Sequence, residues 1–289
     1  MRALRPILSN TAFLTVVAMI AFAANSLLCR MALGQHSIDA ASFTSVRILA
    51  GALTLTLLMI LRGHKQMFGV PDGRGILSLF CYMIFFSFAY ITLSAGTGAL
   101  LLFGAVQLTM FTVAIRSGER FSLASWVGLV IAFSGLVYLV APGVTAPDPL
   151  GAILMVIAGI SWGLYSLIGR GAKNPLLATS GNFAYSVPLA VAASLVFVDD
   201  FEVSMPGVIL AVASGAIASG LGYAVWYVAL QDLTASRAAT VQLSVPVIAS
   251  SGGVLFLSEQ ITLRLGIASL LTIGGIWLVL AQRAQQNKS

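Results

Sequence analysis

The chain has 289 residues, of which 59% are hydrophobic and only 8% are charged. Soluble domains average about 25% charged residues, so this composition excludes a soluble protein and indicates one embedded in a lipid bilayer. The net charge of +6 does not indicate a nucleic-acid partner, because the basic residues lie in short segments between apolar runs, where they orient membrane proteins.

Apolar runs of about 20 residues, the length of a helix that crosses a bilayer, recur along the whole chain. The first run resembles a signal peptide with a cleavage site near Ala23, but it continues through Leu28, so we interpret it as a transmembrane helix. The sequence predicts an all-α membrane protein with ten spans, near residues 8–29, 40–61, 75–93, 97–115, 123–141, 150–169, 178–198, 207–230, 237–257 and 263–282.

The distribution of basic residues gives the orientation. With a cytoplasmic N-terminus, twelve of the fifteen Lys and Arg residues fall in cytoplasmic segments, the outside receives only Arg30 and Arg264, and Arg47 lies within the second span. This bias is typical of membrane proteins, whose cytoplasmic loops are rich in Lys and Arg. We therefore expect a protein of the cytoplasmic (inner) membrane with both termini in the cytoplasm.

The stretch from Ala12 to Ala32 recurs, shifted by 140 residues, as Ala152 to Ala172, with nine of its twenty-one positions identical. This repeat indicates a tandem duplication, with a first unit at 1–145 and a second at 146–289, each of five helices. Because five is odd, the second unit enters the membrane inverted. Inverted repeats place a substrate site near the middle of the bilayer, where the two units meet.

Several features recur in both halves or mark particular helices: a turn after the fourth helix of each half (Gly118-Glu119-Arg120 and Ser258-Glu259-Gln260), Arg47 in the second helix and Pro246 in the ninth. With the ten helices, they resemble the drug/metabolite transporter superfamily, in particular its EamA-type exporters. The resemblance implies a secondary transporter and no enzyme, similar to bacterial exporters of aromatic and other neutral amino acids. Export of another small neutral metabolite or a nucleobase stays an alternative, as does a membrane scaffold or sensor that transports nothing.

Arg47 is the one ionised side chain that we place inside the bilayer, about seven residues into the second helix, because Arg237 and Arg264 lie at the very ends of their spans. A charged side chain in lipid is costly, so this arginine either contacts the substrate or a gate, or clamps neighbouring helices. No Asp or Glu lies within a predicted span. This argues against proton-coupled export of cations, which usually needs an intramembrane acid, and favours facilitative export.

Aromatic residues recur at helical spacing in the third and eighth helices, and polar residues accompany them in the first, fourth and ninth. The stripes either pack against other helices and lipid or wall a cavity, and an aromatic cavity with a few polar groups suits an amino acid with a bulky neutral side chain. The predicted substrate-binding residues are Asn25, Tyr82, Phe86, Gln107, Trp162, Tyr165, Tyr223, Trp226, Gln242 and Ser244.

Two prolines within spans, Pro188 and Pro246, are candidates with Arg47 for a role as a gate or in the structure. Pro246 has no N–H group, so the carbonyl of Gln242 loses its helical partner and is either a ligand for substrate or part of a simple kink; Pro188 is predicted to act as a hinge. The residues form no nucleophile triad, phosphate loop or metal cluster, so we expect no catalytic residue, metal or cofactor. Ten helices can form a complete pathway, and we expect a monomer whose partners are the lipid bilayer and a small-molecule substrate.

Overall fold

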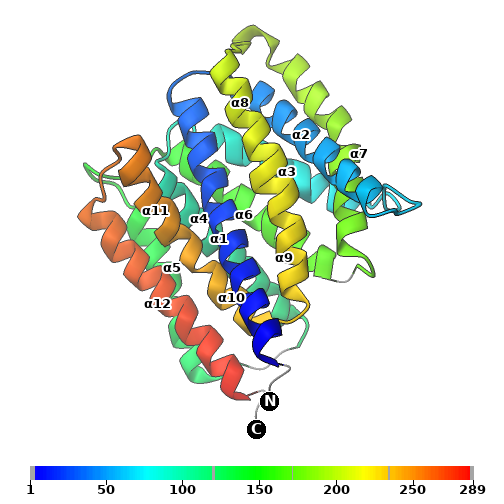
Figure 1. Cartoon of the computed structure of the whole chain (residues 1–289). Coiled ribbons are helices and arrows are strands. Elements are labelled where there is room, and N and C mark those ends of the chain that lie inside the picture. Colours follow the sequence, from blue (N-terminus) through cyan, green and yellow to red (C-terminus); the bar gives the residue numbers. More distant parts are fainter. Residues whose placement is uncertain (1–3, 119–120, 171, 234, 287–289) are drawn as a thin grey trace.

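The computed structural model describes residues 4–118, 121–170, 172–233 and 235–286. Its principal helices are α1 (Leu4–Gly34), α2 (Ala40–Leu61), α3 (Gly73–Ala89), α4 (Ala95–Arg116), α5 (Leu123–Val140), α6 (Pro149–Arg170), α7 (Pro175–Val196), α8 (Met205–Ala213), α9 (Gly222–Leu230), α10 (Ala235–Gln242), α11 (Ser244–Leu257) and α12 (Leu263–Gln286) (Figure 1). Within these residues nine helical segments are long and apolar enough to cross a membrane, and the shorter apolar helix α3 is the tenth. The predicted all-α fold with ten spans is confirmed.

Polar side chains begin several helices. Asp39 accepts a hydrogen bond from the N–H of Ser42 at 2.8 Å at the start of α2, and Asn174 accepts one from the N–H of Leu177 at 3.1 Å at the start of α7. These caps satisfy N–H groups that have no partner in the first turn of a helix. They fix the point at which each apolar run leaves its loop and enters the bundle.

Two of the ten spans are interrupted; the sequence did not predict the first interruption, whereas the second lies at the kink predicted near Pro246. In the span Met205–Leu230 a π-helical segment, η2 (Ser214–Leu221), separates α8 from α9. A Cβ atom added at Gly215 would lie 2.9 Å from the Cα of Arg47, so the backbones of η2 and α2 touch there. Wider helical turns of this kind are frequent at functional sites.

The second interruption lies at Leu243, between α10 and α11, three residues before Pro246. Since proline within a helix removes a hydrogen bond and crowds the preceding turn, Pro246 accounts for the break just before it. Pro188 lies within α7, which runs without a break from Pro175 to Val196. Whether either proline moves during function stays a prediction.

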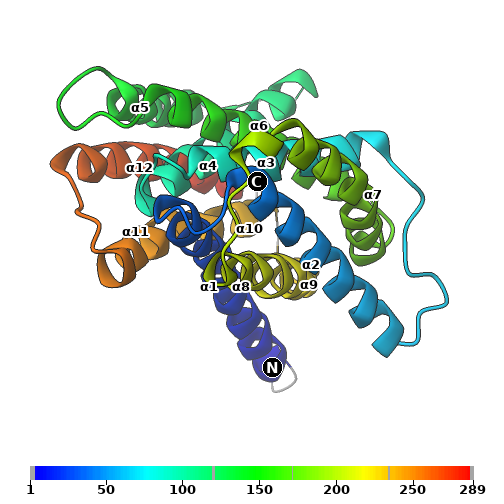
Figure 2. The same cartoon turned by 90° about the horizontal axis from the view of Figure 1, so that it is seen from above.

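The helices pack in a pattern that repeats between the two halves. The equivalent helices α2 and α7, α4 and α11, and α5 and α12 pack against each other, while α1 packs on α9 and α11 just as α6 packs on α3 and α4. In Figure 2 the pair α5 and α12 forms one edge of the bundle, and α2 and α7 form the opposite edge. This is the arrangement expected of two inverted repeats about a pseudo-two-fold axis.

Contacts between equivalent residues locate this axis. The hydroxyl of Thr272 donates to the carbonyl of Ala132 at 3.4 Å, and these residues are separated by 140 positions. Helices from both halves contribute to one hydrophobic core. The assignment of 1–145 and 146–289 to two units therefore concerns the repeat and not two separately packed bodies, and its boundary stays a prediction.

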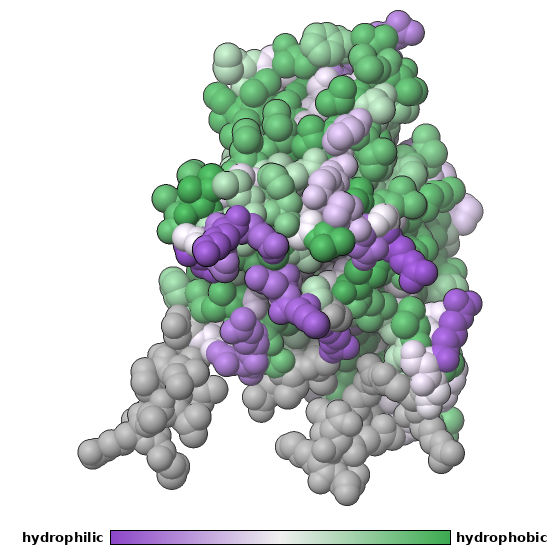
Figure 3. Space-filling view, turned by 90° about the vertical axis from the view of Figure 1, so that its right-hand side faces the viewer, coloured by the Kyte–Doolittle hydropathy of each residue, from purple (hydrophilic) through white to green (hydrophobic). Residues whose placement is uncertain are grey.

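The outer surface of the bundle carries many apolar side chains. Leu53 and Leu57 on α2 and Leu195 on α7 are among the exposed large hydrophobic residues. Figure 3 shows an apolar upper part on one face, with hydrophilic side chains gathered lower, towards the end where both termini lie. Such a surface fits a multi-pass membrane protein, in which lipid covers the apolar part.

Candidate functional site

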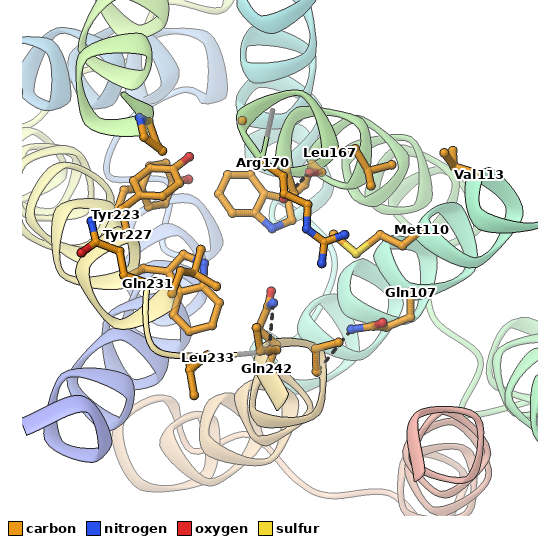
Figure 4. Close-up of a pocket in the computed structure, with 18 of the residues that line it drawn as sticks. Gln107, Met110, Val113, Leu167, Arg170, Tyr223, Tyr227, Gln231, Leu233 and Gln242 are labelled. Carbon is orange, nitrogen blue, oxygen red and sulfur yellow. Dashed lines mark hydrogen bonds between the residues drawn. The ribbon is translucent and has the colours of Figure 1, made fainter. Parts of the chain in front are cut away.

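A cavity of about 1240 Å³ enters the bundle between α4, α6, α9 and α10 (Figure 4). Arg62, Arg170 and Gln231 contribute to its lining, and these residues end or follow α2, α6 and α9. Of these helices, α9 runs down towards the end of the bundle where both termini lie (Figure 1). The cavity is therefore reached from that end.

Aromatic side chains from α6 and α9 form the inner wall of the cavity. Trp162, Tyr223 and Trp226 line it, and the rings of Trp162 and Tyr223 lie 5.0 Å apart. Phe22 of α1 packs edge-on against all three, at centroid distances of 6.2, 5.9 and 5.8 Å. Helices from both halves thus meet in one aromatic cluster at the inner end of the cavity.

A hydrogen-bonded polar group lies directly behind this wall. The ring of Tyr82 is 4.8 Å from that of Trp162, and its hydroxyl accepts hydrogen bonds from Asn25 Nδ2 at 3.2 Å and Arg47 Nη2 at 3.0 Å. Ser214 of η2 donates to Asn25 Oδ1 at 2.5 Å. Asn25 and Tyr82 therefore face the interior, as their polarity requires, although they do not line the cavity.

Arg47 lies at the centre of this polar group. Its side chain is fully buried, with 0% of its surface exposed. Besides the bond to Tyr82, its Nε donates to Ser219 of η2 at 3.4 Å, and its guanidinium carbon lies 4.8 Å from the centroid of the Phe86 ring. Its Nη1 has no hydrogen-bond partner among the described residues. The arginine connects α2 with α3 and with the second half of the protein.

The two predicted glutamines also line the cavity, and Figure 4 shows Gln107 across it from Tyr223. Gln107 Nε2 donates to the carbonyl of Ala239 at 3.4 Å, which joins α4 to α10, and Gln242 Nε2 donates to Ala238 within its own helix at 3.2 Å. Both side chains line the cavity, and an amide oxygen can accept hydrogen bonds from a ligand there.

The remaining predicted residues lie away from the cavity lining. Phe86 packs on Arg47 behind the wall. The ring of Tyr165 is 5.6 Å from that of Trp162, and its hydroxyl donates to Thr179 at 3.2 Å. Ser244 is exposed, and its hydroxyl donates to the carbonyl of Val241 at 2.6 Å. Since Ser244 is exposed and bonds to the last turn of α10, it falls outside the site proposed below.

Sequence reasoning missed several residues of the lining, among them Arg62, Met110, Arg170 and Gln231. One signal could have indicated Arg170, because the 140-residue shift relates it to Arg30 and both lie near the end of the first helix of a repeat. The described lining residues include two arginines and no acidic residue. The cavity therefore has a positive character.

The opposite end of the bundle is closed by contacts between the two halves. Glu259 pairs with Arg30 at 3.5 Å, and its carboxylate accepts from the N–H of Ala95, the first residue of α4, at 2.9 and 3.0 Å. Arg30 also donates to the carbonyls of Tyr90 and Ile91, just after α3, at 3.1 and 2.8 Å. A carboxylate at a helix N-terminus is favourable, so Glu259 stabilises this closure. Its repeat equivalent, Glu119, lies outside the described residues.

A helical bundle of two inverted repeats, hollowed from one end and closed at the other, has the architecture of a membrane transporter. The EamA-like transporter family model matches residues 9–141 and 149–281. The chain belongs to the EamA-like transporter family, and both of its halves carry the family's repeat.

Curated relatives agree with this assignment. The chain is 48% identical over 274 residues to the uncharacterized protein PA1977 of Pseudomonas aeruginosa, covering 95% of this chain and 96% of that protein. It is 23% identical over 262 residues to the uncharacterized transporter YoaV of Bacillus subtilis, covering 86% and 89% of the two chains. It is 26% identical over 158 residues to the uncharacterized inner membrane transporter YedA of Escherichia coli, covering 50% and 48%. A solved crystal structure shares the fold, with a TM-score of 0.65 at 20% identity over 91% of this chain and 98% of that one.

Proposed function

We propose that this transporter exports neutral amino acids, with aromatic ones favoured, across the cytoplasmic membrane by alternating access. The observation that carries this proposal is that the aromatic wall of Trp162, Tyr223 and Trp226 and the amides of Gln107 and Gln242 line one cavity. Ligand pockets are mostly apolar with a few placed polar groups that fix orientation. A bulky neutral side chain fits the aromatic wall, and the amides offer partners for an amino group.

The closed end supports alternating access. If both termini are cytoplasmic, the cavity opens to the cytoplasm and the contacts of Arg30 and Glu259 close the outward path. The repeat relates Arg30 at the closed end to Arg170 at the open rim. An exchange of conformation between the two inverted halves would close the rim and open the other end, as in other inverted-repeat transporters.

Facilitative transport is part of the proposal. The described lining residues include no Asp or Glu that could exchange a proton for substrate, and intramembrane acids are the usual proton carriers of pumps. We therefore propose that the substrate moves down its own gradient. The same cavity could hold another small neutral metabolite or a nucleobase, so the test includes these ligands.

Counterflow in proteoliposomes tests the proposal. Vesicles with purified protein are loaded with unlabelled phenylalanine, methionine, a nucleobase or a quaternary cation, and uptake of the labelled compound is followed with and without a pH gradient. We expect exchange of phenylalanine or methionine that is indifferent to the gradient. Exchange of cations driven by pH, with none of amino acids, would refute the proposal, and absence of flux for every compound would favour a scaffold or sensor.

A further inference from the structure

We infer that the substrate of this cavity is a carboxylate, and that Arg47 and the hydroxyl of Tyr223 recognise its carboxylate group behind the aromatic wall. The inference rests on the proposed function and narrows it: an amino acid qualifies, whereas a nucleobase or an amine does not. It assigns Arg47 a role in binding the substrate and not a purely structural role.

The first reason is that the charge of Arg47 has no counterion among the described residues. Its side chain is fully buried, and its described hydrogen-bond partners are the hydroxyls of Tyr82 and Ser219, which are neutral groups and not carboxylates. Buried charges in membrane proteins normally pair with an opposite charge or mark a substrate pathway. A guanidinium also matches the two oxygens of a carboxylate better than any neutral partner does.

The second reason is that two hydrogen-bond donors without a described partner lie in this buried polar group. Arg47 Nη1 and the hydroxyl of Tyr223 are both buried and both lack a hydrogen-bond partner among the described residues. Leaving such groups unsatisfied is costly, and most buried polar groups are therefore paired. Tyr223 also belongs to the cavity lining. It thus links the cavity to the buried arginine.

The third reason is the short path between the cavity and Arg47. Trp162 separates the cavity from Tyr82 and Arg47, with ring distances of 4.8 Å to Tyr82 and 5.0 Å to Tyr223. A ligand whose ring packs on Trp162 and Trp226 would place a carboxylate at the Tyr223 hydroxyl. A shift of the Trp162 indole would then admit that group to Nη1 of Arg47.

The fourth reason is the charge of the cavity itself. Arg62 and Arg170 contribute to its lining at the open end, and no acidic side chain is among the described lining residues. A cavity lined by one sign of charge raises the local concentration of ligands of the opposite sign. Carboxylates are thus favoured from the rim to the buried arginine.

Ligand-induced thermal stabilisation of the purified full-length protein tests the inference. The probes are phenylalanine, 3-phenylpropionate, which lacks the amino group, and phenylalaninamide and phenethylamine, which lack the carboxylate. We expect the two carboxylates to bind and the other two to bind about tenfold to a hundredfold more weakly, as expected for lost hydrogen bonds to a charged group. Equal binding of phenylalanine and its amide would overturn the inference and leave the proposed function intact. Binding of 3-phenylpropionate but of no amino acid would overturn the proposed function and leave the inference intact. Binding of none of the four compounds would overturn both the inference and the proposed function.

Variants then assign the recognition to these residues. Arg47→Gln should abolish the preference for carboxylates over the amide, and Arg47→Lys should restore part of it, which a purely structural role does not predict. Tyr223→Phe removes only the hydroxyl and should weaken carboxylate binding about threefold to tenfold. It keeps the test decisive if the Arg47 variants do not fold. Tyr185→Phe is the matched control, because the Tyr185 hydroxyl bonds to the Gly69 carbonyl at 3.4 Å, away from the cavity. An unchanged carboxylate preference in Tyr223→Phe and in a folded Arg47→Gln variant contradicts the inference.

Discussion

The rings of Phe22 and Trp162 meet edge to face at 6.2 Å, and the two residues are equivalent positions of the repeat, 140 residues apart. Two equivalent residues can touch only where the pseudo-two-fold axis passes between them. The axis therefore runs through the aromatic cluster at the inner end of the cavity. Because the axis relates the two halves that must exchange conformations, this cluster lies where both access states of an inverted-repeat transporter converge.

Trp226 and Trp277 provide a matched pair for testing the aromatic wall. Trp226 lines the cavity and is 6% exposed, while Trp277 on α12 is 57% exposed on the outer surface. We expect Trp226→Ala to lower the transport rate about tenfold or more, since it removes a stacking surface worth about 1 kcal/mol beyond its buried area. Trp277→Ala should transport like the wild type in the same proteoliposome assay. Equal rates in both variants, at equal yield of folded protein, would remove Trp226 from the site.

Gln242 and Ser244 give a second test, two residues apart on either side of the break at Leu243. Gln242 lines the cavity, whereas Ser244 is exposed and bonds to Val241. Replacing Gln242 with Ala should raise the substrate concentration needed for half-maximal transport about threefold to tenfold, as expected for one lost hydrogen bond. Ser244→Ala should leave that concentration unchanged. The reverse pattern would mean that the helix is rotated in the substrate-bound state.

The sequence predicted the ten helices and the repeat because both depend on properties of single segments. A run of about 20 apolar residues must cross a bilayer as a helix, and identities at a fixed shift are visible without a structure. The π-helical interruption was missed because it depends on a contact between distant segments, whereas the kink near Pro246 was predicted from the proline itself. The wider turns of Ser214 to Leu221 arise where Gly215 packs on the backbone of Arg47, a residue far away in the chain.

The site was predicted less completely because its lining depends on helix rotation. Tyr82 and Trp226 both belong to aromatic stripes, yet Trp226 faces the cavity and Tyr82 lies behind Trp162. Helical spacing shows which residues share a face but not what that face meets. The pairing of Glu259 with Arg30 joins positions far apart in the chain, and neither residue indicates its partner by local pattern.

Removing the charge of Glu259 should loosen the closed end. Glu259→Gln weakens the pair with Arg30 and the bonds to the N–H of Ala95, a loss of about 1–3 kcal/mol. Such a loss raises the population of an outward-open state about tenfold. Glu202→Gln is the control, because the recorded contacts of Glu202 with Asp39 use its backbone N–H and carbonyl.

Labelling measures this change in population. A cysteine introduced at Ser250, which packs against Gly96 at the closed end, should react faster with an impermeant maleimide in Glu259→Gln than in the parent protein lacking Cys29 and Cys81. The Glu202→Gln variant should label at the parent rate. If labelling of Glu259→Gln stays at that rate, the Glu259 contacts do not hold this end closed.

Neighbouring glycines on α12 test the crossing of α5 and α12. A Cβ atom at Gly275 would meet the backbone N of Ala132 at 2.5 Å, whereas one at Gly274 would have nothing within 4 Å. Gly275→Ala must push the helices apart, and we expect it to destabilise the protein by about 1–3 kcal/mol, the usual cost of overpacking. Gly274→Ala should be neutral or stabilise by up to about 1 kcal/mol, since alanine favours helix over glycine. Thermal unfolding in detergent gives the comparison, and a Gly275→Ala variant that melts at or above the temperature of Gly274→Ala would contradict the close backbone contact between α5 and α12.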